Sequence, residues 1–427
     1  MEFEKQRKKE VDWETAIVQQ VVKRIREYYH PEKMSREQVH DTAVTVLGET
    51  LGDAFVDIDQ HANMVKRIYG ELRGYGLLES ILDDESITEV MVHGPDQIFI
   101  ERKGQLERYP QSFGSKEELR HVISKIVETV KRSVDTKNPI QDARLSDGSR
   151  VHVVLSNIAQ QGDILTIRKF TAKPMTIDML IEYGSITPDV AEFLDKLVKA
   201  KYNIFVSGGT GSGKTTYLNA LSNFIQKDQR IITIEDSAEL RIDGIDNLVS
   251  LETRNKNDSG EGGITIQNLI KASLRMRPDR IVVGEVRGEE ALDMLQAMNT
   301  GHEGSMSTGH ANSAKDMLTR LETMIMQGGS DLPLDAIRRQ IGSALDIIIH
   351  LSRLRDKSRK TMEIVEVLGY QSATAVAPGD YILNTLYKFE IDREKSTPEK
   401  VVGQLKRTKN KMENREKLEL AGFFDMI

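Results

Sequence analysis

The chain contains no cysteine among its 427 residues. This absence excludes disulfide bridges, iron–sulfur clusters and thiolate zinc sites, and it is compatible with a reducing cytoplasm. No apolar stretch approaches the ~20 residues that a membrane-spanning helix needs. The first residues, MEFEKQRKKEVDW, are charged where a secretory signal peptide would be apolar. We therefore expect a cytoplasmic protein without an integral membrane segment, which would reach a membrane only through a partner.

The chain also lacks a large excess of either charge, since 59 basic residues face 66 acidic residues and the net charge is -7. This balance argues against a protein that coats nucleic acid and predicts no direct nucleic-acid partner. The hydrophobic fraction of 39% and the charged fraction of 29% are typical of a globular protein. A chain of 427 residues is too long for one ordinary hydrophobic core, so we expect two or three domains.

Residues 1–75 have the periodicity of amphipathic helices. In WETAIVQQVVKRIREYY the apolar residues Ile17, Val21, Ile25 and Tyr28 recur every three or four positions, which predicts one buried stripe. We interpret this segment as a helical N-terminal bundle that packs on itself. A docking arm for a partner is the alternative.

Residues 76–172 alternate short β-rich runs with turn pairs, as in ITEVMVHGPDQIFIERKGQLERY and ARLSDGSRVHVVLS. Between them, SKEELRHVISKIVETVKR predicts a helix that a Ser–Glu capping box opens. These patterns predict a small α+β domain. Residues 173–190 contain two prolines and are interpreted as a linker that runs into the first helix of the next domain.

Residues 191–427 alternate apolar strands with helices. YNIFVSGG, RIITIED and DRIVVGEV are short apolar runs, and helical patterns separate them, one of them a long helix that ends in LRMRP. This order predicts an α/β domain whose mostly parallel sheet is covered on both faces. The last forty residues, which include EKVVGQLKRTKNKMENREKLELAGFF, are expected to form a charged amphipathic helical end.

The most specific motif is a phosphate-binding loop, GGTGSGKT, which follows the strand YNIFVS and precedes an expected helix. Glycines allow successive backbone N–H groups to surround an anion, and the helix N-terminus adds positive potential. We expect Lys214 to reach the β- and γ-phosphates and the Thr215 hydroxyl to bind Mg²⁺. The predicted nucleotide contacts are Gly208, Gly209, Thr210, Gly211, Ser212, Gly213, Lys214, Thr215 and Thr216.

Acidic residues follow two later apolar strands. RIITIEDSAEL places Glu235, Asp236 and Glu239 after one strand, and DRIVVGEV places Glu285 after another. The carboxyl ends of sheet strands face the nucleotide crevice, so we expect these carboxylates near the phosphates. Glu285 has the position of the acid that holds the water shell of Mg²⁺. Helix capping is the alternative for Glu239, and an ordinary salt bridge is the alternative for Asp236.

Two histidines, His302 and His310, lie in TGHEGSMSTGHANSA. Their spacing matches no common zinc pattern, the motif HExxH is absent, and no cysteine could assist. Metal ligands and buried histidines satisfied by the backbone remain alternatives. We favour a third interpretation, in which both imidazoles face the γ-phosphate and distinguish ATP from ADP.

These motifs together resemble the type II/type IV secretion ATPase superfamily, and within it the CpaF-type ATPases that drive assembly of tight-adherence (Tad) pili. TIEDSAE resembles the Asp box of the superfamily, DRIVVGEV its atypical Walker B motif and TGHEGSMSTGHANSA its His box. ITEVMVHGPDQIFIERKG and ARLSDGSRV…LTIRKF are similar to the N-terminal half of the subfamily. The resemblance covers about Leu77 to Tyr370. It implies a RecA-like P-loop ATPase domain at 191–427, preceded by the α+β domain.

The resemblance also implies a homohexamer that hydrolyses ATP to ADP and phosphate with Mg²⁺. Glu239 would be the base or orienter of the attacking water, and Glu285 would help hold the water shell of the metal. Lys214 and Glu235 complete the implied catalytic set. The resemblance further implies nucleotide contacts by His302, His310, Arg144 and Arg168. Arginine forks match phosphate oxygens, although a surface charge is the alternative for each arginine.

The implied machine is a motor at the inner face of the cell membrane that acts on inner-membrane platform proteins to assemble, and also to retract, a pilus, or to secrete protein. A DNA-translocating RecA-like ATPase is the main alternative, and a kinase or a nucleotide-gated scaffold are others. The sequence departs from the family pattern at Ser237-Ala238, where pilus extension and retraction enzymes have a proline. It also has Gly309 where a bulkier residue is commoner, and we expect this glycine to loosen the backbone at His310.

Overall fold

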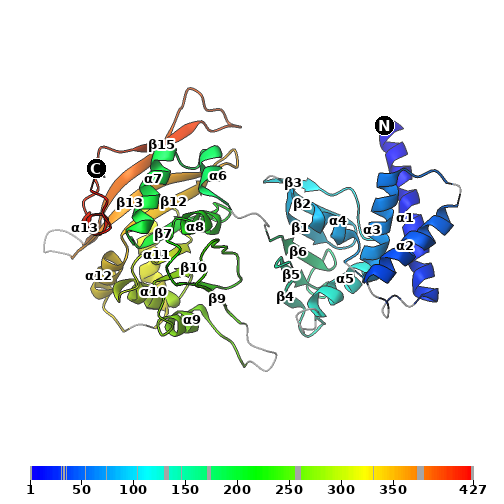
Figure 1. The fold of residues 1–427 in the computed structure, drawn as a ribbon, viewed down its shortest axis with the longest axis horizontal. Helices are drawn as coiled ribbons and strands as arrows, with labels where there is room; N and C mark the ends of the chain where they lie inside the picture. The colour runs from blue at the N-terminus through cyan, green and yellow to red at the C-terminus, as the bar shows by residue number, and fades with distance from the viewer. Residues whose placement is uncertain are drawn as a thin grey trace. The chain divides into compact units, whose positions relative to one another are not determined.

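The computed structural model describes residues 2–29, 31, 34, 36–52, 54–73, 75–102, 104–128, 134–145, 147–170, 175–254, 261–329, 331–372 and 379–424. The chain divides into two compact units, Met1–Ala172 and Lys173–Ile427, and each is described by itself. Figure 1 shows the elements of both units along the chain.

The first unit begins with three helices, α1 (Glu2–Tyr28), α2 (Arg36–Leu51) and α3 (Ile58–Arg73). Their apolar faces form one core, in which Val21 and Ile25 are fully buried and Ile17 packs at the edge. The predicted stripe is wrong at Tyr28, which is 73% exposed. Tyr28 is the last residue of α1, so the buried stripe ends one turn before the helix does.

The same unit continues as an α+β fold. Its helices are α4 (Leu77–Asp83) and α5 (Lys116–Glu128), and its strands are β1 (Ile87–His93), β2 (Gln97–Arg102), β3 (Gln105–Arg108), β4 (Ile140–Arg144), β5 (Arg150–Val154) and β6 (Ile164–Arg168). The strands pair in the order β3-β2-β1-β6-β5-β4, with every pair antiparallel. Ser115 caps α5, since its Oγ accepts from the Glu118 backbone N–H at 3.1 Å. The Glu118 carboxylate accepts from Gly114, one residue before the contact that a capping box would make.

The second unit is an α/β fold. Its helices are α6 (Ile177–Glu182), α7 (Pro188–Lys199), α8 (Lys214–Ser222), α9 (Ile266–Ser273), α10 (Glu290–Asn299), α11 (Ala314–Gln327), α12 (Leu334–Ala344) and α13 (Glu416–Leu420). Its strands are β7 (Ile204–Gly208), β8 (Ile231–Glu235), β9 (Leu248–Glu252), β10 (Arg280–Val283), β11 (Met306–Gly309), β12 (Ile347–Arg353), β13 (Arg359–Gln371), β14 (Asp380–Ile391) and β15 (Gly403–Arg407).

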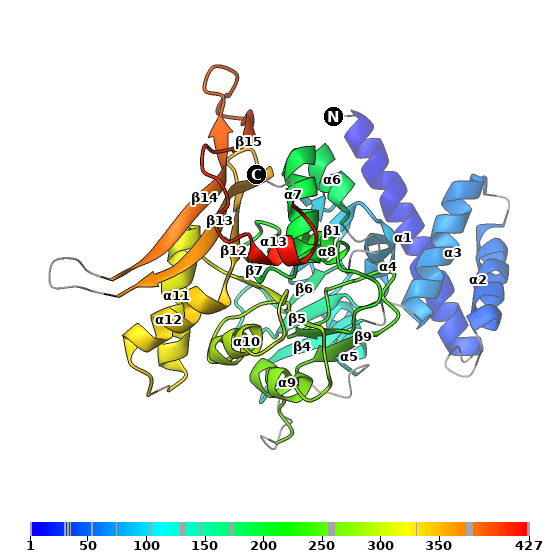
Figure 2. The same cartoon turned by 60° about the vertical axis from the view of Figure 1, so that its left-hand side comes forward.

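These strands form one sheet in the order β15-β14-β13-β12-β7-β11-β10-β8-β9. The strands from β12 to β9 are parallel, and β13, β14 and β15 extend the sheet antiparallel. Buried residues of α6, α7 and α8 form the core on one face, and those of α9 to α12 form the core on the other. The predicted α/β class, with a mostly parallel sheet covered on both faces, is confirmed. Figure 2 shows the long hairpin of β13 and β14 that carries the antiparallel extension.

Two local expectations need correction. The last forty residues contain the end of β14, all of β15 and the short helix α13, so they are not a helical end. Their charged residues lie on exposed positions of β14 and of the edge strand β15, a pattern that resembles the polar face of a helix. The helix that ends in LRMRP is short, because α9 covers only Ile266–Ser273. The segment 173–190, interpreted as a linker that runs into the first helix of the next domain, contains α6, whose Leu180 is buried in the core of the second unit.

None of the described helices combines the length and the apolar character that crossing a membrane requires.

Candidate functional site

The phosphate-binding loop lies between the fully buried strand β7 and the N-terminus of α8. Gly211 and Gly213 have φ values of 70° and 91°, which glycine adopts without strain. A side chain at Gly208 would place a Cβ atom 2.5 Å from the Leu351 carbonyl oxygen. The Ser212 hydroxyl donates to the Gly209 carbonyl at 2.8 Å and closes the loop on itself. The backbone geometry of the loop therefore requires glycine at Gly208, Gly211 and Gly213.

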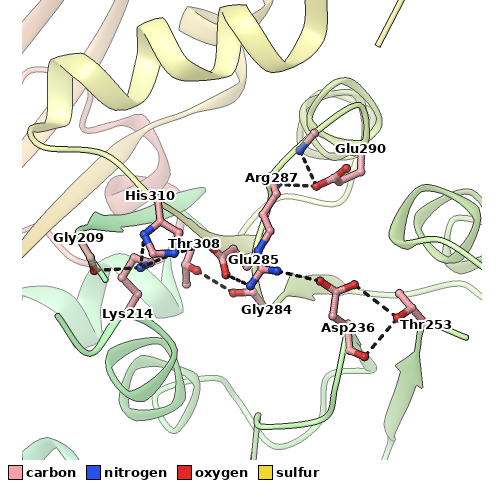
Figure 3. Close-up of polar contacts among 11 residues, drawn as sticks. Gly209, Lys214, Asp236, Thr253, Gly284, Glu285, Arg287, Glu290, Thr308 and His310 are labelled. Carbon is pink, nitrogen blue, oxygen red and sulfur yellow. Dashed lines mark hydrogen bonds and ion pairs between the residues drawn. The ribbon is translucent and has the colours of Figure 1, made fainter. Parts of the chain in front are cut away.

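Lys214, His310 and Glu285 meet beside this loop (Figure 3). Lys214 Nζ donates to the Gly209 carbonyl at 3.2 Å and lies 3.3 Å from His310 Nδ1. His310 Nε2 lies 2.9 Å from Glu285 Oε1. These residues come from α8, the end of β11 and the end of β10, which are brought together by the strand order β7-β11-β10. The site places His310 between the lysine of the loop and the carboxylate that follows β10.

Burial, and then the Lys214 ammonium, lower the pKa of His310. The imidazole is therefore neutral at neutral pH, and the ammonium beside it remains the cation of the pair. His310 Nε2 and Glu285 Oε1 are close but are not aligned for a hydrogen bond, and among the described residues Glu285 Oε1 has no hydrogen-bond partner. A buried carboxylate oxygen of this kind suits a bound water or a hydrated metal.

Arg287 is a site residue that the sequence analysis missed. Its Nη2 donates to Glu285 Oε2 at 2.7 Å, and its Nη1 lies 3.5 Å from Asp236 Oδ2. The Glu285 carboxylate raises the pKa of Arg287, against the opposing effect of burial, and Asp236 and Glu239 contribute further. Arg287 thus links the acids that follow β8 and β10, as Figure 3 shows for Asp236 and Glu285. Arg287 could have been identified from the sequence by its position two residues after Glu285, at the end of the same strand.

The Glu235 carboxylate organises the loop that carries Glu239. Glu235 is 4% exposed, and its Oε1 accepts from the backbone N–H of Glu239 at 2.9 Å and of Leu240 at 3.0 Å. A side chain at Gly284 would place a Cβ atom 2.9 Å from Glu235 Cγ, so this glycine leaves room for the carboxylate. The structure therefore places Glu235 in backbone contacts that fix a neighbouring segment.

Asn219 of α8 fixes the same loop from the other side. Its Nδ2 donates to the Glu239 carbonyl at 3.1 Å, and its Oδ1 accepts from the Arg241 backbone N–H at 2.8 Å. Both backbone groups of Glu239 are thus fixed, while its side chain is half-buried. This arrangement holds Glu239 beside α8, the helix that begins at Lys214.

The residues present fit Mg²⁺ at this place. Thr215 is half-buried in the first turn of α8, and Glu285 offers its buried Oε1 close to Lys214 and His310. Hydroxyl and carboxylate oxygens are the ligands that Mg²⁺ prefers, usually with water and phosphate completing the shell. Thr216 is exposed on the same turn.

His302 does not join the other histidine. It lies in the turn before β11, whose residues Met306 and Gly309 pair with Ile204 and Ser207 of β7. The phosphate loop follows the carboxyl end of β7, so the whole of β11 separates His302 from it. The expectation that His302 faces phosphate within its own subunit is therefore corrected. Its buried Nδ1 has no hydrogen-bond partner among the residues that the structure describes.

Gly309 does not loosen the backbone at His310. It is a buried residue of β11, and a Cβ atom there would lie 2.9 Å from both Phe205 Cε1 and Met317 Cε. The expectation of a loosened backbone is wrong, because close packing and strand pairing hold this glycine.

Arg144 and Arg168 belong to the first unit and lie on β4 and β6. Arg150 of β5, which the sequence analysis missed, pairs with both of them across the sheet. Paired residues point to the same face, so these arginines form a row. Arg144 Nε donates to the Gly148 carbonyl at 3.1 Å, and Arg168 lies 3.6 Å from Glu89. The row gathers positive charge on one face of this unit.

Two further arginines border the phosphate loop. Arg359 Nε donates to the Gly211 carbonyl at 3.0 Å, and Arg353 approaches the same glycine from the other strand of the hairpin. Both residues are exposed and belong to the basic run RLRDKSRK. That run was visible in the sequence, but its place beside the loop follows from the pairing of β12 with β7.

Comparisons with known proteins agree with this architecture. The sequence profile of the family described as "Type II/IV secretion system protein" matches residues 71–397. The conjugal transfer protein TrbB of Rhizobium radiobacter is 31% identical over 316 residues, which cover 73% of this chain and 93% of that protein. The type IV secretion system protein VirB11 of Brucella suis is 33% identical over 296 residues, which cover 63% of this chain and 82% of that protein. The X-ray structure of the ATPase DotB of Yersinia pseudotuberculosis aligns with a TM-score of 0.51 at 16% identity, over 73% of this chain and 80% of that chain, a likeness of fold alone.

Proposed function

The chain belongs to the type II/IV secretion system protein family, and on this premise we propose that it is a motor ATPase that hydrolyses ATP to ADP and phosphate. The observation that carries this proposal is the contact of Lys214, His310 and Glu285 beside a phosphate-binding loop. Lysine and backbone N–H groups bind phosphate, and an adjacent carboxylate at a strand end suits a metal-bound water. The groups that would bind phosphate and the carboxylate that would support hydrolysis thus lie together at the carboxyl ends of neighbouring parallel strands.

The residues of the site divide into direct and positioning roles in this proposal. Lys214 leaves the Gly209 carbonyl to bind the β- and γ-phosphates, and Glu239 orients the attacking water. Glu235 acts as a positioning residue, because its carboxylate is already bonded to the backbone of the Glu239 loop. His310 stays neutral beside Lys214 and senses the charge that arrives with the γ-phosphate.

Mg²⁺ is the proposed cofactor, and Thr215 and Glu285 are the residues that would hold it, Glu285 through water. When bound, the ion neutralises charge that develops on the phosphate oxygens. Arg287 holds Glu285 in place through its hydrogen bond to Oε2, which leaves Oε1 for this role.

The arginine row of the first unit supports a second part of the proposal. We infer that Arg144 and Arg168 contact the γ-phosphate when ATP is bound, as the family resemblance implies. A row of guanidinium groups on one sheet face concentrates positive potential and matches phosphate geometry. Release of these contacts after hydrolysis would convert the loss of phosphate into domain motion, as in other phosphate switches.

We further propose that the protein works as a homohexamer at the cytoplasmic face of a membrane, against inner-membrane platform proteins. Assembly of a Tad-type pilus, with or without retraction, is the pathway that the CpaF-like motifs favour, and protein secretion is the broader one. The name of VirB11, a type IV secretion system protein, supports the general assignment. The name of TrbB, a conjugal transfer protein, keeps DNA translocation as a second candidate.

A phosphate-release assay tests the proposal. The full chain with ATP and Mg²⁺ should release phosphate in repeated turnovers, and Lys214→Ala should abolish release. Mass measurement with and without nucleotide should show a six-subunit species. Stimulation of turnover by DNA would favour the second candidate, and phosphoryl transfer to an acceptor without phosphate release would identify a kinase. Nucleotide binding without turnover in the wild type would contradict the proposed hydrolase.

A further inference from the structure

A cleft of about 610 Å³ opens beside the phosphate loop and extends along α11. Gly209 and Thr210 of the loop line it together with His310 and Arg287, and a face of α11 forms the rest of its wall. Figure 3 shows Gly209, His310 and Arg287 around Lys214. His310 lies 3.3 Å from Lys214 Nζ, so the cleft borders the place where this lysine would hold the β- and γ-phosphates.

The face of α11 that lines the cleft is mostly polar. The apolar residues of the helix point into the core of the second unit, where Leu318 and Leu321 are buried. Asp316, Arg320 and Thr323 line the cleft, at the spacing of three or four residues that defines one helix face. A wall of this kind suits a charged or hydrated ligand, because an apolar ligand would leave its polar groups without partners.

Arg320 supplies a positive charge that no neighbour neutralises. Arg287 also lines the cleft, but its guanidinium donates to Glu285 at 2.7 Å and lies 3.5 Å from Asp236. Arg320 makes no hydrogen bond or ion pair with any residue that the structure describes. Asp316 is the acid among the described lining residues, and although it lies one turn earlier on α11 it does not pair with Arg320. The Arg320 guanidinium is therefore available to an anion that enters the cleft.

The charge of Arg320 also acts on the place where phosphate would lie. Burial is the largest cause of the lowered pKa of His310, Lys214 is the next, and Arg320 adds to them in the same direction. A cation that disfavours positive charge on His310 favours negative charge beside it. A guanidinium fork matches the oxygens of a phosphate group in geometry as well as in charge.

We propose that the cleft is a subsite for a terminal phosphate group and that Arg320 binds this group, either as the γ-phosphate of bound ATP or as inorganic phosphate after hydrolysis. Lys214 belongs to the phosphate loop, whereas Arg320 brings a further cation from α11. The subsite rests on the proposed function, which places ATP at the loop and produces phosphate beside the cleft.

Direct binding measurements on the full chain separate the two sources of phosphate. A contact with the γ-phosphate predicts that Arg320→Gln weakens binding of a non-hydrolysable ATP analogue about three- to tenfold and ADP binding less than about twofold. A contact with released phosphate predicts unchanged binding of the analogue and of ADP, with a similar loss of affinity when inorganic phosphate is titrated into the ADP complex. Either result supports the subsite. Unchanged analogue binding together with unchanged or absent phosphate binding would overturn it.

Two variants of the same helix control for net charge. Asp316→Asn removes the acid of the cleft and should strengthen binding of the same anion about two- to threefold. Lys315→Gln removes a cation that pairs with Asp380 at 2.6 Å and is not among the residues that line the cleft. It should leave binding within about twofold of wild type. Equal losses in Lys315→Gln and Arg320→Gln would reduce the effect to overall charge and refute the subsite, and thermal unfolding shows whether each variant is folded.

Binding of the analogue needs no turnover, so the subsite and the proposed hydrolase can fail separately. A wild type that binds the analogue without hydrolysing ATP would contradict the proposed function, and a selective loss of analogue binding in Arg320→Gln would still support the subsite. A wild type that hydrolyses ATP, with an Arg320→Gln variant that binds the analogue and phosphate as wild type does, would retain the proposed function and refute the subsite.

Discussion

Gly284→Ala tests how the end of β10, where Gly284 lies, positions the Glu235 carboxylate at the end of β8. The new Cβ atom would lie 2.9 Å from Glu235 Cγ, closer than real Cβ contacts come, and 3.2 Å from Glu235 Oε1, which is tighter than most. Gly284 cannot retreat easily, because its N–H donates to the Ile234 carbonyl at 2.8 Å and its carbonyl accepts from Thr308 Oγ1 at 2.7 Å. The Glu235 carboxylate must therefore move.

The magnitude follows from the bonds that this movement breaks. Glu235 Oε1 accepts from the backbone N–H groups of Glu239 and Leu240. A hydrogen bond to a charged group contributes about 1.5–3 kcal/mol, and ~1.4 kcal/mol corresponds to a tenfold change in rate. Loss of one bond should thus lower kcat by about 10- to 100-fold if it misplaces Glu239. ATP affinity should change less than about threefold, since neither residue belongs to the phosphate loop.

Steady-state phosphate release over a range of ATP concentrations, with direct nucleotide binding, measures both quantities. Glu235→Gln is the matched control, because it keeps an acceptor oxygen for the same N–H groups and should be milder than Gly284→Ala. Thermal unfolding confirms that each variant is folded. Wild-type kcat in Gly284→Ala would refute the reasoning. Complete inactivity of Glu235→Gln would show that Glu235 takes part in the chemistry itself.

The remaining predictions concern three other regions. Burial, with the nearby Glu118, raises the pKa of Glu71 to about 7, so folded protein binds more protons than unfolded protein above pH 4.5 and loses stability as pH rises toward 7. Glu71→Gln should therefore raise the unfolding free energy of the first unit by about 2 kcal/mol at pH 8 and little at pH 4.5, and a higher gain at low pH would contradict this sign. His302→Ala should keep kcat within about twofold of wild type, whereas His310→Ala should not, as phosphate release would show. Arg359→Gln should weaken ATP binding about three- to tenfold by freeing the Gly211 carbonyl, and unchanged affinity would argue against a role for this arginine in the loop.

Part of this site could be predicted because its residues follow the carboxyl ends of parallel strands in one sheet. The carboxyl ends of β7, β8, β10 and β11 carry the phosphate loop, Glu235, Glu285 and His310, and parallel strands bring such ends together. The error at His302 has the same origin. One motif spans both ends of β11, and sequence proximity conceals that the strand separates its two histidines.

Other contacts could not be predicted because they depend on strand order. Glu363 of β13 accepts from the Ala314 backbone N–H because β13 lies beside β12, and Arg359 reaches the Gly211 carbonyl because β12 lies beside β7. Nothing in the local sequence of β12 specifies this neighbour. The prediction of a helical chain end was wrong for a related reason, since β14 and the edge strand β15 carry charges on their exposed positions.

We propose above all that Glu239 is required for the hydrolysis of ATP, whereas the phosphate-binding loop with Lys214 is required for binding ATP. The most direct test is Glu239→Gln in the full chain, with nucleotide binding and phosphate release measured on the same sample. We expect ATP to bind with near wild-type affinity and to remain unhydrolysed. Wild-type turnover in Glu239→Gln would contradict the account.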